Sequence, residues 1–342
     1  AGSLVVYVEY NSGRDGSRLC GGRDRPPSVP YSGLVQAMID AKLRAGFWRL
    51  ADPKISITSA ASMATGASLA AGHPGFSWPW LLILGLAMFC MEVAKNAWGD
   101  VFDYDSGTDL AVRPEDRTDF SGGKRVLVDG ILTRGQTWGI AFGFALLGLV
   151  LGALIGFWRA PSVFRLGALG LVLGWSYHGP PLRLAYRGLG ELDVVLCYGP
   201  IIALSTYVVM TGHYAAGPVW LSVPLGLLIT AFLWVNEFPD YHADLGAGKY
   251  NLVARLGKRR AARILPFIYL AAFALLAALP LLTSMPWTIL LGFLALPAAV
   301  MAVHWTLQDP EGFHRHKPVQ PAALLTFVLY STGVTVGVLS GG

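Results

Sequence analysis

Two stretches of the chain carry an asparagine and two aspartates at helical spacing. They read Asn96-x3-Asp100-x2-Asp103 and Asn236-x3-Asp240-x3-Asp244. Residues three or four apart share one face of a helix, so each stretch stacks its amide and carboxylates on one side. Stacked carboxylates repel one another, and a hard divalent cation relieves that repulsion. Mg²⁺ takes oxygen ligands and is often shared with substrate phosphates, so the pattern predicts magnesium ions around one diphosphate.

The candidate residues for this chemistry form three groups. The metal-ligand candidates are Asn96, Asp100, Asp103, Asp109, Asn236, Asp240 and Asp244. Four of these, Asp100, Asp103, Asp240 and Asp244, are also the catalytic candidates. Basic side chains predicted to lie on the same side can neutralise phosphate oxygens, and an aromatic face can stabilise a cationic carbon. The substrate-binding candidates are therefore Lys124, Arg125, Tyr177, Arg183 and Lys249.

The elements that must position these residues are long apolar segments. Of the 342 residues, 54% are hydrophobic and only 14% are charged, whereas a soluble domain carries about a quarter charged residues. Segments near the ~20 residues that cross a bilayer lie at 55–72, 77–96, 137–157, 163–178, 191–212, 217–236, 262–282, 286–305 and 320–340. The sequence predicts an all-α integral membrane protein with about nine transmembrane helices around a central cavity.

Basic residues test this arrangement. With nine spans, the N-terminal segment and the loops after spans 2, 4, 6 and 8 share one side of the membrane. All but two of the 26 lysines and arginines fall there, and the exceptions are Arg159 and Arg165. The positive-inside rule then predicts a cytoplasmic N-terminus and an external C-terminus in the cell membrane. The same rule explains the net charge of +5 without nucleic acid as a partner.

Three polar segments stand apart from the spans. Residues 1–43 include a Gly-, Arg-, Ser- and Pro-rich stretch without an apolar run, and we expect a flexible cytoplasmic tail there, followed by one transmembrane domain over 44–342. Residues 97–136 and 237–261 are expected to be long polar loops that begin with the acidic stretches. The three cysteines form no CxxC or Cys/His cluster, so neither a disulfide framework nor a zinc site is predicted.

Three longer motifs resemble one known family. They are Asp100–Asp109 with the following Gly-Gly-Lys-Arg, Pro180–Glu191, and Asn236–Asp244 with Gly248–Gly257. Over roughly residues 44–340 the chain resembles the UbiA superfamily of intramembrane prenyltransferases, and within it the MenA branch, which prenylates 1,4-dihydroxy-2-naphthoate in menaquinone synthesis. It departs from the family pattern at Gly99 and Glu237, and at Asp52-Pro53-Lys54, where Arg-Pro is usual.

The resemblance implies Mg²⁺-dependent transfer of a polyprenyl group from polyprenyl diphosphate to an aromatic acceptor, with 1,4-dihydroxy-2-naphthoate as the expected acceptor. Other acceptors of the superfamily remain open, namely 4-hydroxybenzoate, homogentisate, a tetrapyrrole or glycerol phosphate. A transporter that uses intramembrane acids to bind a coupling cation is the alternative from another class. The placement of the acids at helix ends, beside large loops, favours the enzyme.

Overall fold

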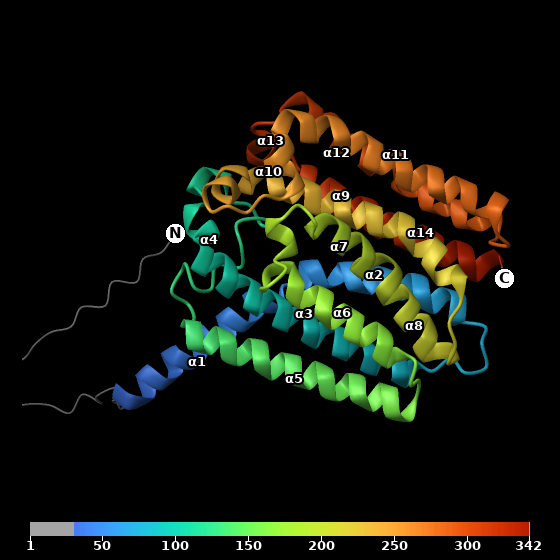
Figure 1. Ribbon diagram of the computed structural model, residues 1–342, viewed down its shortest axis with the longest axis horizontal. Coiled ribbons are helices and arrows are strands. Elements are labelled where there is room, and N and C mark those ends of the chain that lie inside the picture. Colours follow the sequence, from blue (N-terminus) through green and yellow to red (C-terminus); the bar gives the residue numbers. More distant parts are fainter. Residues whose placement is uncertain (1–30, 342) are drawn as a thin grey trace, which may run out of the picture. The chain divides into compact units, whose positions relative to one another are not determined.

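The computed structural model describes residues 31–341, with side chains from Asp40 onward, and shows a bundle of helices (Figure 1). The chain divides into two units between Ala41 and Lys42, and the elements discussed below belong to the second unit. Helix α1 (Tyr31–Ala51) contains the predicted domain boundary at residue 43. The first thirty residues of the predicted flexible tail lie outside the described residues, whereas residues 31–43 are helical.

Nine helical segments of the described chain coincide with the nine predicted spans. They are α2 (Pro53–Ala70), α3 (Trp78–Ser106), α5 (Arg134–Trp158), α6 (Val163–His178), α7 (Gly190–Leu196) with η3 (Cys197–Ile201) and α8 (Ile202–Thr211), α9 (Ala216–Gly246), α11 (Lys258–Leu282), η4 (Trp287–Ala295) with α12 (Leu296–Gln308), and α14 (Val319–Gly341). Short elements join them, namely α4 (Thr108–Ala111), η1 (Pro114–Asp116), η2 (Leu184–Tyr186), α10 (Leu252–Leu256) and α13 (Phe313–His316).

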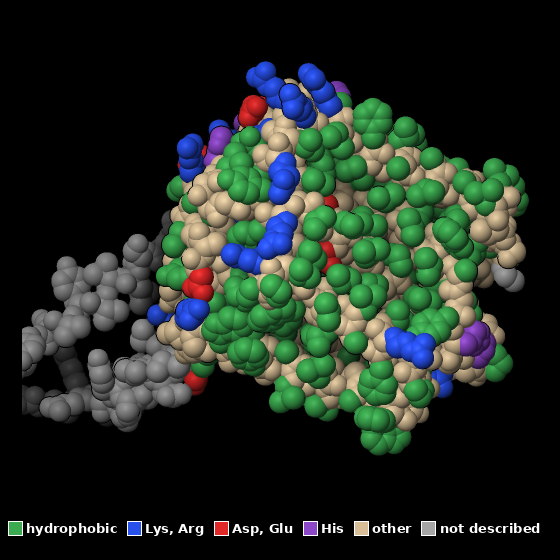
Figure 2. Space-filling model, in the orientation of Figure 1, with side chains coloured by type: hydrophobic (Ala, Val, Ile, Leu, Met, Phe, Trp, Pro, Cys, Tyr) green, Lys and Arg blue, Asp and Glu red, His purple; other side chains and the backbone are tan. Residues whose placement is uncertain are grey.

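Seven of these nine segments are long and apolar enough to cross a bilayer. The other two are α2, which is rich in serine and threonine, and α6, which has only 16 residues. The prediction of an all-helical, multi-pass membrane protein is confirmed, and the number nine is approximate. Figure 2 shows apolar side chains over most of the face that runs along the helices, as expected of a surface that contacts lipid.

Two of the predicted boundaries are wrong, and both matter for the site. Spans predicted to end at residues 96 and 236 continue as helix to Ser106 in α3 and to Gly246 in α9. The acidic stretches therefore lie in the last turns of two long helices and not at the start of loops. Hydropathy marks only the part of a helix that faces hydrocarbon, whereas the α3 helix ends where Gly107 adopts a left-handed conformation (φ 84°).

The ends of α3 and α9 lie at the same end of the bundle. In Figure 1 this end also carries α4, α10 and α13, while the C-terminus lies at the opposite end. Figure 2 shows most of the visible lysine and arginine side chains at this end. The core of the bundle is built around α9, which packs against α7, α11 and α14. Backbones approach closely where a methyl group at Gly226 would lie 2.6 Å from the Val195 carbonyl oxygen.

Candidate active site

The two acidic stretches meet around one lysine. The Lys249 ammonium lies 3.0 Å from Oδ2 of Asp103 on α3 and 3.8 Å from Oδ1 of Asp244 on α9. Burial alone would lower the pKa of Lys249, but the charges of Asp103 and Asp244 outweigh it and raise that pKa well above its usual value. Helices far apart in sequence thus bring both sets of acids to one cation-binding position.

In the first set, Asp103 is the most heavily bonded acid. Its Oδ1 accepts a 2.6 Å hydrogen bond from the Tyr186 hydroxyl, and its Oδ2 lies 3.6 Å from Nε2 of His178. Burial and the charge of Asp103 raise the pKa of Tyr186 to about 12, so this phenol remains a donor at neutral pH. One turn earlier, Asp100 accepts from the backbone of Leu127 at 3.3 Å. These contacts fix the direction in which the carboxylates point.

The amide of Asn96 has a structural partner. Its Nδ2 donates to the Leu50 carbonyl oxygen at 2.8 Å. Asn96 therefore ties the middle of α3 to the end of α1, within the unit that begins at Lys42. Only its side-chain oxygen is left for a metal ion, one turn before Asp100.

In the second set, loop backbone and a capping residue hold the acids. Asp240 accepts from the Gly122 amide at 3.0 Å. Asp244 accepts from Nδ2 of Asn251 at 2.7 Å, while Oδ1 of Asn251 accepts from the Ala254 amide and caps helix α10. One asparagine thus begins a helix and positions an acid.

Asp109 on α4 joins the two sets. It is only 3% exposed, and the Gly123 backbone lies so close that a methyl group there would lie 2.1 Å from its Oδ2. Burial raises the pKa of Asp109 well above its usual value, and the charges of Asp103, Asp100 and Asp240 raise it further. Because acids of both helices influence it, Asp109 belongs to the same cluster.

Several oxygens of this cluster are buried without a hydrogen-bond partner, which is costly unless a cation or water satisfies them. They are Oδ1 of Asp100, Oδ2 of Asp109, Oδ1 of Asn236, Oδ1 of Asp240 and Oδ1 of Asp244. Such a set of oxygens fits Mg²⁺. Within residues 31–341, no three acidic, histidine or cysteine side chains lie close enough to hold one ion directly. An ion here would bind partly through water and phosphate oxygens, as Mg²⁺ commonly does.

Two of the predicted phosphate-binding residues have partners outside the cluster. Lys124 forms an ion pair with Asp52, and Nη2 of Arg125 lies 2.8 Å from Oδ1 of Asp129. Burial lowers the pKa of Lys124, although the charge of Asp52 opposes that effect. Both basic residues follow Gly122, whose amide donates to Asp240, in the same loop.

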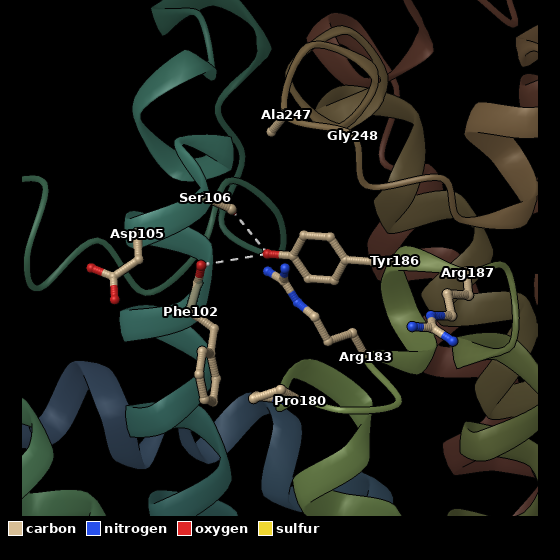
Figure 3. Close-up of a pocket in the computed structure, with 9 residues that line it drawn as sticks. All are labelled: Phe102, Asp105, Ser106, Pro180, Arg183, Tyr186, Arg187, Ala247 and Gly248. Carbon is tan, nitrogen blue, oxygen red and sulfur yellow. Dashed lines mark hydrogen bonds between the residues drawn. The ribbon is translucent and has the colours of Figure 1, made fainter.

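A cavity of about 600 Å³ opens beside the cluster, lined by α3, the loop from Gly179 to Leu189, and the end of α9. Figure 3 shows the Tyr186 ring pointing across this cavity toward Ser106, with the Arg183 side chain beside it. The Arg183 guanidinium lies 4.0 Å from the Tyr186 ring centre. Arg183 thus lines the cavity, whereas Asp105 points away and pairs with Arg134 at 2.7 Å.

Tyr177 is partly buried, and its ring packs edge-on to His178 at 4.7 Å between centres. The contact between His178 and Gly99 was not predicted from the sequence. A methyl group at Gly99 would lie 2.9 Å from the His178 ring. The sequence did contain a signal for this contact. Gly99 departs from the family pattern, and a residue without a side chain leaves room for a neighbouring side chain.

Comparison with known proteins identifies the family. Residues 59–331 match the UbiA prenyltransferase family. A 2-carboxy-1,4-naphthoquinone phytyltransferase of Synechocystis is 29% identical over 62% of this chain and 67% of its own length. A 1,4-dihydroxy-2-naphthoate octaprenyltransferase of Haemophilus influenzae is 27% identical over 88% of this chain and 98% of its own length.

Solved structures show the same fold. An apo UbiA homologue from Aeropyrum pernix has a TM-score of 0.61 at 20% identity and covers 82% of this chain and 97% of its own. A UbiA homologue from Archaeoglobus fulgidus bound to GPP and Mg²⁺ has a TM-score of 0.54 at 15% identity and covers 85% of this chain and 99% of its own. With its bundle of membrane helices, its paired acidic stretches and a family match over most of its length, the chain belongs to the UbiA prenyltransferase family and is an enzyme that transfers prenyl groups.

Proposed function

We propose that this enzyme transfers a polyprenyl group from polyprenyl diphosphate to 1,4-dihydroxy-2-naphthoate, in an Mg²⁺-dependent step of menaquinone synthesis. The observation that carries the proposal is the single cluster formed by the acids of α3, α4 and α9, with unpartnered buried oxygens in both acidic stretches. The naphthoate acceptor is supported by relatives that bear that activity in their names. A homologue of the same fold binds GPP and Mg²⁺.

The acids would bind the diphosphate through Mg²⁺, and the basic residues would bind its oxygens directly. Asp100, Asp103, Asp240 and Asp244, with Asn96, Asn236 and Asp109, would hold Mg²⁺, which when bound neutralises the diphosphate and stabilises its departure. Lys249 contacts two of these acids, and it would turn its ammonium to a phosphate oxygen when the diphosphate binds. Arg183 offers a planar fork of donors at the adjoining cavity.

The apolar interior of the bundle suits the two organic partners. Each CH₂ of a polyprenyl tail gains ~0.8 kcal/mol when it leaves water, so the tail favours the space among the helices or the surrounding lipid. A site that excludes water also protects the cation-like allylic carbon until the electron-rich ring attacks it. The carbon–oxygen bond to pyrophosphate breaks as the new carbon–carbon bond forms. Loss of carbon dioxide from the naphthoate then leaves its bonding electron pair on the ring and restores aromaticity.

A product assay tests this proposal. The full chain, purified and reconstituted, would receive Mg²⁺, polyprenyl diphosphates of several lengths, and 1,4-dihydroxy-2-naphthoate, 4-hydroxybenzoate and homogentisate in equal amounts. We expect a product with the mass of a prenylated, decarboxylated naphthohydroquinone. Exclusive prenylation of another acceptor would overturn the naphthoate assignment, and the absence of any prenylated product would overturn the reaction.

The acids are tested separately with a matched pair of variants. Asp240→Asn removes a charge from the cluster and should lower kcat by at least about a hundredfold, since several kcal/mol of charge stabilisation are lost. Asp119→Asn removes an exposed carboxylate and should leave kcat unchanged. Near-normal turnover by Asp240→Asn, with both variants equally stable, would contradict the role of the acidic cluster.

The orientation is also part of the proposal. We expect the cluster end of the bundle to face the cytoplasm, because most of the lysines and arginines in the described part of the chain gather there, whereas Arg159 and Arg165 follow predicted span 3 and Lys95 lies within α3. Single cysteines introduced at Lys317 and Thr283, in a background without native cysteines, provide the measurement. A membrane-impermeant thiol reagent added to intact cells should label the residue 283 variant and leave the residue 317 variant unlabelled, and the reverse pattern would contradict this orientation.

A further inference from the structure

A lysine inside the bundle has no role in the reaction described above. Lys95 was counted with the loop residues in the sequence, but it lies in α3, eleven residues before that helix ends at Ser106. Residues 92–94 and 96–101 are buried on either side of it, whereas Lys95 itself stays partly accessible. An ammonium inside a membrane helix is costly and is typically found at a functional position.

The surroundings of Lys95 are aromatic. Its ammonium lies 5.7 Å from the centre of the Tyr177 ring and 5.8 Å from the centre of the Tyr198 ring. Its hydrogen bond to the Tyr198 hydroxyl is long, at 3.4 Å. Both tyrosines are also partly accessible. Two ring faces and one cation are the groups that bind a flat aromatic anion.

Lys95 lacks a close anionic partner. Across the part of the chain with described side chains, no carboxylate forms an ion pair with its ammonium within 4 Å. Glu92 and Asp193 are near enough to feel its charge, but each has another donor: Ser59 donates to Glu92, and the Cys197 thiol donates to Asp193 at 3.5 Å. The ammonium is therefore held in place without being neutralised by direct contact.

The position of Lys95 relative to the acids is set by helix geometry. Lys95, Gly99 and Asp103 are spaced by four residues, so they lie on one face of α3, and two turns separate Lys95 from Asp103 by about 12 Å. Two consecutive residues of α6, Tyr177 and His178, lie against this face of α3. Tyr177 packs near Lys95, while His178 packs against Gly99 and reaches toward Asp103.

The second tyrosine comes from an irregular segment. Tyr198 lies in η3, a π-helical stretch that contains Pro200 and a non-helical Gly199 (φ −96°, ψ −106°). The Ser62 hydroxyl donates to the Tyr198 carbonyl oxygen and anchors the segment to α2. Such π-helical segments occur frequently at functional sites, because they redirect one side chain within a long helix.

We propose that Lys95 binds the carboxylate of the aromatic acceptor, with Tyr177 and Tyr198 against its ring. The proposal rests on the proposed function and deepens it, because it names the residues that would bind the carboxylate and the ring of the acceptor. A ring held at Lys95 would lie two helical turns of α3 from Asp103, deeper in the bundle than the acidic cluster. A neutral phenol would gain less from the ammonium than a carboxylate does, because it lacks the opposite charge.

Binding can be measured without turnover. The stable probe 1-hydroxy-2-naphthoate and its carboxylate-free analogue 1-naphthol would be titrated into the reconstituted full chain, with intrinsic tryptophan fluorescence as the readout. Lys95→Met should weaken binding of 1-hydroxy-2-naphthoate by about ten- to a hundredfold, the usual worth of a hydrogen bond to a charged group. It should change 1-naphthol binding little, and Lys95→Arg should restore most of the loss. Lys317→Met, at an exposed lysine, is the matched control.

Two results would overturn the proposal. Equal weakening of both probes by Lys95→Met would show a merely structural role, and no weakening would show that the carboxylate binds elsewhere. Turnover separates this proposal from the proposed function. If wild-type enzyme prenylates 4-hydroxybenzoate in place of the naphthoate, and Lys95→Met raises KM for that carboxylated acceptor alone, then the naphthoate assignment fails and the lysine assignment stands.

Discussion

Replacing Lys249 tests whether one cation position is shared by the two acidic stretches. In the structure its ammonium lies 3.0 Å from Asp103 and 3.8 Å from Asp244. At an effective dielectric constant of about 20, these two attractions are worth about 5.5 and 4.4 kcal/mol before the cost of burial is subtracted. Lys249→Met removes both and leaves two buried carboxylates that face each other.

The net loss is smaller than these gross attractions. Breaking a buried ion pair by removing one partner costs about 3–5 kcal/mol, and water that enters from the adjoining cavity offsets part of that. With about 3 kcal/mol lost and roughly 2 °C per kcal/mol for a chain of this size, we expect the melting temperature without Mg²⁺ to fall by about 6 °C. Thermal unfolding in detergent, followed by tryptophan fluorescence, measures this.

Magnesium provides the decisive second measurement. With the ammonium gone, Mg²⁺ can satisfy Asp103 and Asp244 in its place, and a ligand that binds only the folded state raises the melting temperature. The rise in melting temperature caused by Mg²⁺ should therefore be larger for Lys249→Met than for the wild type. Without Mg²⁺, the melting temperatures of the two proteins should still differ. Identical melting temperatures, with identical responses to Mg²⁺, would refute the shared position. Lys317→Met should behave as the wild type does.

Two further perturbations follow from single contacts. Gly99→Asn drives a side chain into His178, so we expect overpacking to lower the free energy of unfolding by about 1–3 kcal/mol. We also expect kcat to fall, because His178 is pushed away from Asp103; unchanged kcat and stability would contradict the contact. The second perturbation is Asp116→Asn. Asp116 accepts a hydrogen bond from Arg315 at 2.7 Å. Burial would raise the pKa of Asp116, but this hydrogen bond and the positive charge of Arg315 lower it. The stabilisation is thus fully present above the usual aspartate pKa of about 3.9 and is lost as pH falls through the lowered value. The melting-temperature gap between wild type and Asp116→Asn should therefore be constant at neutral pH and begin to close below about pH 4. A gap that stays constant on further acidification would contradict the contact.

Much of the fold was predictable because the bilayer imposes a single strong pattern. Apolar segments of spanning length located all nine helical segments, including α6, where only 16 residues are helical. The helix ends were not predictable in this way. Polar residues continue α3 and α9 for ten residues past the apolar spans, and Gly107 was the signal for the end of α3.

The candidate site was predictable in its acids and less so in its supporting contacts. Spacing of three and four residues placed Asp100 beside Asp103 and Asp240 beside Asp244, because helix geometry is local. The bridge by Lys249, the hydroxyl of Tyr186 and the position of Lys95 depend on how distant helices pack. Charge counting assigned Lys95 to a loop, because hydropathy does not distinguish a charged residue inside a helix from one beyond its end.

The two longest helices make the site sensitive to the lipid around it. With 29 and 31 residues, α3 and α9 are about 43 and 46 Å long, well beyond the ~30 Å hydrocarbon thickness. Helices that exceed this thickness tilt to fit, and they tilt further in thinner membranes. The acids lie on the C-terminal turns of α3 and α9, so the distance between their carboxylates then depends partly on the acyl-chain length of the lipids. Vesicles made from lipids of different acyl-chain length would therefore change the rate of catalysis without any substitution in the protein.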